Sequence, residues 1–264
     1  MPESAALPLP PLGMRALVGP LEDGDFDNPS GLPVIAGLPD EAWDFVFDFG
    51  CGCGRLARQL IQQKPRPRRY LGVDLHAGMI RWCQRNLAPH APELEFVHQD
   101  VRNPGFNPDG AHEALPFPVE SGAVSLLIGW SVFTHLRQAA ADFYLRETAR
   151  VLKPDGRAHT TWFVFDKRDF PMMQSFQNAL FINDCDPTNA VIFDRNWLAE
   201  RCAAAGLAMA HIEPPRVRGY QWQIELRLLA GGASSREFPV DLAAPMRMPP
   251  PLLPAAAHKL GLDD

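Results

Sequence analysis

The sequence predicts an α/β protein whose mostly parallel sheet is covered by helices on both faces. Strand and helix signals alternate from about residue 44 to residue 229, which is typical of parallel sheets because each connecting helix covers a face of the sheet. A glycine-rich turn at residues 50–54, which read GCGCG, follows the first predicted strand. Acidic residues, Asp74 and Asp100, close the second and third predicted strands.

The predicted strands are short β-prone runs bounded by glycine, proline or acidic residues. They span residues 44–49, 69–73, 94–98, 123–129, 158–165, 207–212 and 221–229. The predicted helices carry apolar residues at helical spacing and end near proline or glycine. They span residues 56–63, 77–87, 139–152 and 197–205. Residues 153–156 (KPDG) predict a turn before the fifth strand, and the last two strands can form a hairpin at the sheet edge because no helix separates them.

The chain divides into a central domain and two flanks that are rich in proline. Residues 1–43 form the N-terminal arm and lead-in, residues 44–230 the main domain, and residues 231–264 a proline-rich C-terminal tail. Proline disrupts helix interiors and central strands, so residues 1–15 and 232–264 are expected to be extended or disordered.

Composition excludes several classes of protein. The net charge of −6 and the pI of about 5.7 argue against nucleic acid as a partner. No apolar run reaches the ~18 residues that a membrane helix needs. Cys51 and Cys53 have no second pair at a spacing that suits a metal, and the total of five cysteines argues against a disulfide framework. We expect a cytoplasmic protein without a bound metal, and the sequence does not predict its oligomeric state.

The glycine-rich turn and the acids around it predict a site for a nucleotide-like ligand. Glycine lets the backbone approach a ligand, and the helix that follows directs its N–H groups toward it. Asp48 precedes the first glycine by two residues, while Asp74 is placed to accept hydrogen bonds from ribose hydroxyls and Asp100 from an adenine amino group. Open α/β sheets bind ligands at the carboxyl ends of successive strands, where all these residues fall.

In these motifs the chain resembles the class I methyltransferases that use S-adenosylmethionine. The resemblance is carried by DFGCGCGR at 48–55, GVDL at 72–75, GMI at 78–80, QDV at 99–101, LPFP at 115–118, SVFTHL at 131–136 and the stretch 145–156. It implies a three-layer Rossmann-like sandwich with a seven-stranded, mostly parallel sheet and an antiparallel last strand, which fits residues 221–229. An insert at 102–114 departs from the pattern, because many relatives run directly into the LPF stretch.

The resemblance also implies a reaction and roles for individual residues. The chain would transfer a methyl group from S-adenosylmethionine to an oxygen or nitrogen atom of a small metabolite, sugar or lipid-like acceptor. The glycine loop would hold the methionine part of the cofactor, Asp74 the ribose, Met79 one face of adenine, and Asp100 its amino group. The full expected cofactor set is Asp48, Gly50, Cys51, Gly52, Gly54, Arg55, Asp74, Leu75, Met79, Asp100, Val101 and Trp130.

His135 is the candidate general base, because it follows the fourth strand and histidine titrates near neutral pH. The alternative is that His135 only begins a helix or binds a backbone carbonyl. Aromatic residues at 170–181 suggest a mobile lid over an apolar acceptor pocket, or else a fixed helix that completes the core.

Two other functions compete with methyl transfer. The first is a nicotinamide-dependent oxidoreductase, against which the G-x-G-x-G spacing counts because dinucleotide sites read G-x-G-x-x-G. The second is a non-catalytic interaction module with the same fold, against which the intact glycines and acids count.

Overall fold

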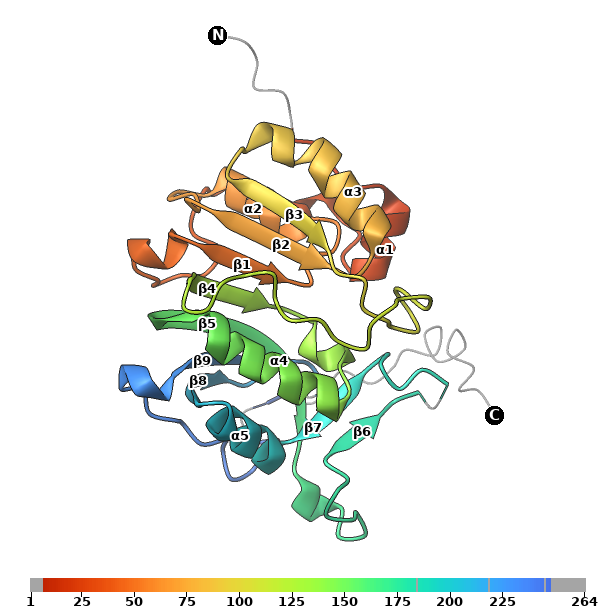
Figure 1. The fold of residues 1–264 in the computed structure, drawn as a ribbon. Coiled ribbons are helices and arrows are strands. Elements are labelled where there is room, and N and C mark those ends of the chain that lie inside the picture. Colours follow the sequence, from red (N-terminus) through yellow and green to blue (C-terminus); the bar gives the residue numbers. More distant parts are fainter. Residues whose placement is uncertain (1–6, 184, 218, 245, 248–264) are drawn as a thin grey trace.

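The computed structural model describes residues 7–183, 185–217, 219–244 and 246–247. Within them, nine strands form one sheet whose main path runs β3-β2-β1-β4-β5-β7-β6, while β9 pairs with β5 and β8 pairs with β9 (Figure 1). The strands are β1 Val46–Phe49, β2 Tyr70–Asp74, β3 Leu94–His98, β4 Val124–Gly129, β5 Leu152–Phe165, β6 Ala179–Phe181, β7 Val191–Asp194, β8 Leu207–Glu213 and β9 Trp222–Leu228.

The predicted fold class is confirmed. Strands β3, β2, β1, β4 and β5 pair in parallel, and the last strand, β9, runs antiparallel to β5. The predicted hairpin of β8 and β9 is present, although β9 lies between β5 and β8 and only β8 reaches the edge. The hairpin of β6 and β7 was not predicted from the sequence, because its strands have only three and four residues.

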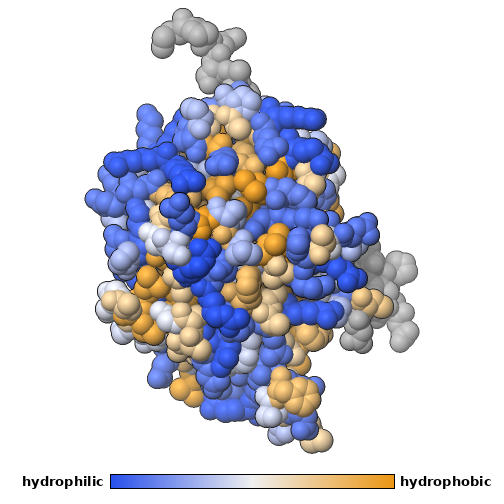
Figure 2. All heavy atoms as spheres, in the orientation of Figure 1, coloured by the Kyte–Doolittle hydropathy of each residue, from blue (hydrophilic) through white to orange (hydrophobic). Residues whose placement is uncertain are grey.

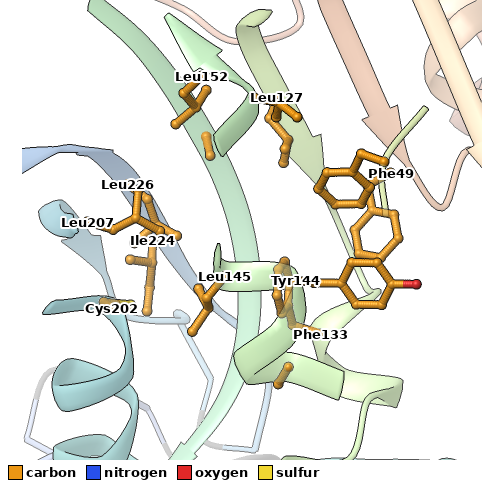
Figure 3. Packing of buried hydrophobic residues seen from close by; sticks show 14 of the residues in the cluster. Phe49, Leu127, Phe133, Tyr144, Leu145, Leu152, Cys202, Leu207, Ile224 and Leu226 are labelled. Atoms are coloured by element: carbon orange, nitrogen blue, oxygen red, sulfur yellow. The ribbon is translucent and has the colours of Figure 1, made fainter. Parts of the chain in front are cut away.

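Helices cover both faces of the sheet because successive strand residues point to opposite sides. The longer helices are α2 Arg55–Gln62, α3 Ala77–Asn86, α4 Gln138–Val151 and α5 Arg195–Ala204. From β1, Phe47 and Phe49 join the core beneath α4 and α5, whereas Val46 joins the core beneath α2 and α3. Figure 3 shows Tyr144 and Leu145 of α4 gathered with Phe49 between this helix and the sheet. Each such buried side chain contributes about 1.5–3 kcal/mol to stability.

The predicted turn at residues 153–156 is instead a bulge inside β5. Val124 of β4 pairs with Leu152, and the next paired residue, Leu126, lies opposite Arg157. An advance of two residues along β4 therefore corresponds to an advance of five along β5. The KPDG run forms the bulge, and the two strands pair on both sides of it. The strand accordingly begins at Leu152, six residues before the predicted start.

The N-terminal arm is not wholly extended, contrary to the expectation for residues 1–15. Helix α1, Leu12–Val18, begins directly after Pro11, and the buried side chain of Arg15 donates to the carbonyl oxygens of Pro10 (2.7 Å) and Leu21 (2.9 Å). Farther back, Arg58 of α2 donates to the carbonyl oxygen of Pro8 at 3.1 Å. Proline is common just before or at the first residue of a helix, where its missing N–H leaves no hydrogen bond unmade. The arginine side chains supply the donors that the carbonyl oxygens of this segment need.

The first part of the C-terminal flank is also packed. Phe238 meets Trp222 of β9 edge-on, with ring centroids 5.4 Å apart. Arg195 at the start of α5 donates to the carbonyl oxygen of Pro239 at 2.6 Å. Residues 233–239 have neither helix nor strand, as expected for an extended flank, but these contacts pack the segment against the domain. Residues 248–264 of the predicted tail lie outside the described residues.

Candidate ligand site at the carboxyl ends of the strands

A cavity of about 540 Å³ opens at the carboxyl ends of the central strands. The arrowheads of β1, β2 and β4 in Figure 1 point to one side, where α1, the loop at 102–114 and β7 also lie. The cavity is lined by the turns after β1, β2 and β4, with α1, the insert at 102–114 and the loop before β7 completing the walls.

The glycine loop after β1 forms one wall. Gly50 and Gly52 have φ angles of +79° and +54°, a conformation in which a side chain is strained. The N–H groups of Gly50 and Cys51 both donate to the carbonyl oxygen of Val73, at 2.9 and 3.0 Å, so the loop is anchored to β2. A Cβ atom on Gly52 would lie 2.8 Å from Val18 of α1. The N-terminal helix therefore needs glycine at position 52 in order to reach this wall.

Gly54, the third glycine, has a different role from the first two. It does not line the cavity. A Cβ atom on it would lie 2.5 Å from Leu87 and 3.0 Å from Cys83, both beside α3 or in it. Gly54 therefore allows the turn and α3 to pack closely, as the last glycine of such loops commonly does.

Asp74 at the end of β2 is half-buried and lines the cavity. Its Oδ2 atom accepts the N–H of Gly52 at 2.8 Å, and its Oδ1 atom accepts the N–H of His76 at 2.7 Å. Burial raises the pKa of this carboxyl, and the two backbone donors act in the opposite direction. Because a carboxylate oxygen can accept more than one hydrogen bond, both oxygens retain capacity for two hydroxyl groups of a ligand.

Asp48, at the penultimate position of β1, is buried beneath the glycine loop. The Tyr70 hydroxyl donates to its Oδ2 atom at 2.6 Å. Burial, opposed by this hydrogen bond, raises the pKa of Asp48 to about 7. Asp48 also lines the cavity, so near neutral pH it presents a carboxyl group that exists in both protonation states.

The structure divides the predicted adenine contacts. Leu75, Met79 and Val101 line the cavity, as does Gln99, which the sequence did not single out. Asp100 does not line it, because its carboxylate accepts a hydrogen bond from Asn107 of the insert at 2.9 Å. This hydrogen bond, against a smaller effect of burial, lowers the pKa of Asp100. The insert therefore holds the acid whose partner was expected to be the adenine amino group.

The turn after β4 supplies Trp130 and Ser131 to the opposite wall. Ser131 has φ +56°, which is uncommon for a residue other than glycine. Its N–H donates to the hydroxyl of Thr161 at 2.7 Å, and its Oγ atom lies 3.0 Å from the amide nitrogen of Gln221. Strained backbone of this kind is concentrated at functional sites, where the surrounding contacts hold it in place.

His135 lines the cavity with one ring nitrogen already occupied. It ends the short helix η4, Phe133–His135, and its Nδ1 atom lies 2.9 Å from the carbonyl oxygen of Thr188. Since a carbonyl oxygen only accepts, Nδ1 carries the proton and Nε2 is the acceptor in the neutral ring. Phe106 of the insert meets the ring edge-on at 5.9 Å. His135 thus binds a backbone carbonyl, and this contact leaves Nε2 available as a base.

Several lining residues were not identified from the sequence. They are Ala16, Leu17, Val18, Gly19, Gln99, Asn103, Phe106, Asn189, Ala190 and Gln221, among others. Two segments join on this side, because Asn103 donates to Thr188 Oγ1 at 3.3 Å. Asn103 could have been predicted as a site residue, because the insert that contains it departs from the family pattern. No local motif in the sequence marks residues 186–190.

The aromatic segment at 170–181 lies away from the cavity. None of its residues lines it, and Met172 and Phe176 are 88% and 75% exposed. Figure 2 shows hydrophobic atoms at the lower tip of the molecule, where Figure 1 places the loop that follows β5. Neither a lid over the site nor a core helix describes this segment, because most of it is an exposed loop that leads into the short strand β6.

Two features are absent from the described residues. Across 7–183, 185–217, 219–244 and 246–247, no helix has the length and apolar character required to cross a membrane. In the same part of the chain, no three histidine, cysteine or acidic side chains come together as a metal site would require.

Comparison with known proteins points to one family. Residues 46–156 match the family described as a methyltransferase domain. A fatty-acid O-methyltransferase from Mycolicibacterium smegmatis is 32% identical over 152 residues, which cover 56% of this chain and 46% of that protein. A phthiotriol/phenolphthiotriol dimycocerosates methyltransferase 1 from Mycobacterium ulcerans is 33% identical over 112 residues, covering 42% and 34%. The matches span less than half the length of these relatives.

Solved structures share the fold at low sequence identity. Geranyl diphosphate C-methyltransferase from Streptomyces coelicolor A3(2), solved with S-adenosyl-L-homocysteine, superposes with a TM-score of 0.51 at 16% identity and covers 70% of this chain and 71% of its own. A putative methyltransferase from Haloferax volcanii gives a TM-score of 0.51 at 18% identity, covering 73% and 86%. At these identities the likeness concerns the fold alone.

Proposed function

We propose that this chain, whose residues 46–156 match a methyltransferase domain, belongs to the class I S-adenosylmethionine-dependent methyltransferases and transfers a methyl group to a small-molecule acceptor. The observation that carries this proposal is that one cavity joins the glycine loop, Asp74 and His135. The comparisons support neither a nicotinamide-dependent oxidoreductase nor a non-catalytic module. The acceptors of the relatives differ, so the acceptor has to be inferred from this chain.

The residues present fit S-adenosylmethionine. Gly50 and Gly52 allow Val132 and Val18 to pack closely against the loop that forms one wall, and the carboxylate of Asp74 faces the cavity with lone pairs free for ribose hydroxyls. Arg55 is the cation among the described lining residues, and it would pair with the carboxylate of the methionine part. Met79 and Gln99 would bound the adenine end in place of Asp100.

The cofactor, when bound, supplies a methyl group that its sulfonium centre already activates. The chain therefore has to bind, orient and exclude water rather than form a covalent bond of its own. Trp130 and Val132, which follow β4, line the cavity beside the glycine loop. His135 would accept the proton of the acceptor on Nε2, since Thr188 holds its Nδ1–H.

We place this reaction in the cytoplasm because the cysteines of the core are free thiols. Cys51, Cys53, Cys83 and Cys202 are buried and unpaired among the described residues. Unpaired thiols are typical of reducing compartments.

The experiment that tests the proposal is calorimetric titration of S-adenosylhomocysteine into the protein and two variants. Asp74→Ala removes the charged acceptors, each worth about 1.5–3 kcal/mol at most, so affinity should fall at least tenfold. Asp74→Asn should give a smaller loss because one oxygen acceptor remains. Asp109→Ala, on the exposed part of the insert, is the matched control and should bind normally. Wild-type protein that fails to bind, or unchanged affinity of Asp74→Ala, would contradict the proposal.

A further inference from the structure

The half of the cavity that faces away from Asp74 has its own chemical character. We call it the acceptor wall and define it as Ser131, His135, Phe106, Phe163 and Gln221. Ser131 and His135 follow β4, Phe163 lies in β5, and Gln221 precedes β9. In the sheet order, β4, β5 and β9 follow one another on the side of β1 opposite to β2. These four residues therefore lie on the side of β1 away from Asp74, and Phe106 of the insert, which follows β3, joins them through its edge-on contact with His135.

The polar groups of the acceptor wall are uncharged and already oriented. Ser131 Oγ and the amide of Gln221 lie 3.0 Å apart and form a pair that can both donate and accept. Thr161 accepts the N–H of Ser131 and holds its left-handed backbone, while the contacts with Gln221 orient its hydroxyl. Arg55, the cation among the described lining residues, begins α2 directly after the glycine loop and would be used by the cofactor.

His135 offers this wall a base rather than a cation. The carbonyl oxygen of Thr188 accepts the Nδ1–H at 2.9 Å, so Nε2 of the neutral ring has a lone pair to receive a proton. Thr188 is itself held by Asn103 of the insert, at 3.3 Å. The described residues of this wall include no lysine or arginine that could pair with an anionic acceptor, so the wall favours an uncharged one.

The remaining surface of the wall suits an aromatic ring. Phe106 and Phe163 line it together with the aliphatic side chain of Leu136. Phe106 already meets the imidazole of His135 edge-on, at 5.9 Å. Aromatic rings favour such edge and offset contacts with one another.

From these contacts we infer that the acceptor is an uncharged aromatic molecule whose phenolic hydroxyl is methylated; this rests on the proposed function. A phenol has a pKa of about 10, whereas an aliphatic alcohol is a much weaker acid. An imidazole can therefore accept the proton of a phenol more readily than that of an alcohol. The hydroxyl proton passes to Nε2 of His135, the phenolic oxygen forms a bond to the methyl carbon, and the carbon–sulfur bond breaks with its electron pair remaining on sulfur. The products are an aryl methyl ether, S-adenosylhomocysteine and one proton.

The first test measures binding to protein saturated with S-adenosylhomocysteine, using 2-naphthol and 2-naphthoate as matched probes. 2-Naphthol should bind at least tenfold more tightly than 2-naphthoate. Equal affinities, tighter binding of the carboxylate, or binding of neither probe would overturn the inference. Saturation with S-adenosylhomocysteine is measured beforehand, and its failure would count against the proposed function instead.

The second test follows transfer of labelled methyl groups to 2-naphthol. Ser131→Ala and Gln221→Ala should raise KM at least fivefold and leave S-adenosylhomocysteine affinity unchanged. Gln174→Ala, an exposed glutamine outside the cavity, is the matched control. Absence of transfer by wild-type protein, or preferred transfer to 2-naphthoate, would overturn the phenolic acceptor.

The third test separates a base from a structural histidine. His135→Asn keeps an N–H donor for the carbonyl oxygen of Thr188 but removes Nε2. Its kcat should fall at least 100-fold, the usual contribution of a general base being about 10²–10⁴. Affinity for 2-naphthol should stay within threefold, and the remaining activity should rise with pH as the phenol ionises in solution. Unchanged kcat and an unchanged pH profile would refute the assignment.

Discussion

Asp48 allows a quantitative test, because it is an ionisable group buried against the cavity. In the folded protein burial raises its pKa from the ordinary value near 3.8 to about 7, against the lowering effect of the Tyr70 hydroxyl. Between these two pH values the folded chain keeps a proton that the unfolded chain has lost. The contribution of Asp48 to stability is therefore most favourable below pH 4, declines as pH rises to about 7, and is constant above that.

The expected slope follows from linkage. One proton held only by the folded state changes the free energy of unfolding by about 1.4 kcal/mol per pH unit. Asp48→Asn keeps the size of the side chain and an oxygen for the Tyr70 hydroxyl, but it carries no charge at any pH. The variant should match the wild type near pH 4 and become several kcal/mol more stable than the wild type by pH 8.

Urea unfolding of wild type, Asp48→Asn and the exposed control Asp109→Asn, measured from pH 4 to pH 8, checks this expectation. Subtracting the variant curve from the wild-type curve removes the contributions of all other titrating groups. Tyr70→Phe removes the donor that lowers the pKa of Asp48, so its stability should go on falling to a higher pH. Parallel wild-type and Asp48→Asn curves, separated by a constant offset, would refute a raised pKa.

Three further substitutions test other parts of the structure. Gly52→Val should abolish S-adenosylhomocysteine binding and make the N-terminal helix sensitive to protease, because its branched side chain would collide with Val18; normal binding with normal protease resistance would contradict both. Asn103→Ala should lower kcat with 2-naphthol more than it raises KM, since it loosens the loop that holds the candidate base; a pure KM effect would count against this. Met172→Ala and Phe176→Ala should alter stability by no more than about 0.5 kcal/mol and leave kinetics unchanged, as both side chains are exposed outside the cavity; a raised acceptor KM would restore the lid.

Local motifs predicted the parallel part of the fold well. Each strand from β1 to β4 is a short β-prone run bounded by turn or acidic residues, so its position could be predicted to within about two residues from the sequence pattern. The bulge at residues 153–156 could not, because a KPDG run has the same composition whether it ends a helix or interrupts a strand. The hairpin of β6 and β7 is held by pairing such as Leu180 with Ile192, which leaves no periodic signal over three or four residues.

Helix α1 shows how tertiary contacts override composition. A proline-rich flank predicts an extended arm, yet Arg15 and Arg58 satisfy the carbonyl oxygens of this segment. Neither arginine carries a motif, and Arg58 lies 50 residues beyond Pro8, the residue whose carbonyl it binds. The glycine at position 52 was read as clearance for a ligand, and the structure adds that it is also clearance for Val18.

The two halves of the cavity differ in how far they could be predicted, and the difference has a physical origin. The cofactor side is built from short-range turns, such as the one in which Asp74 accepts the N–H of His76. The residue types that such turns need are close together in the sequence and can be recognised there. The acceptor wall is built from contacts between distant segments: Asn103 with Thr188 spans 85 residues, and Ser131 with Gln221 spans 90. Recognition of the cofactor can therefore stay constant while the segments on the acceptor side change independently. Proteins that match over residues 46–156 can accordingly act on different molecules. For this chain we expect the choice of acceptor to depend on the insert and on the loop before β7, because both line the cavity.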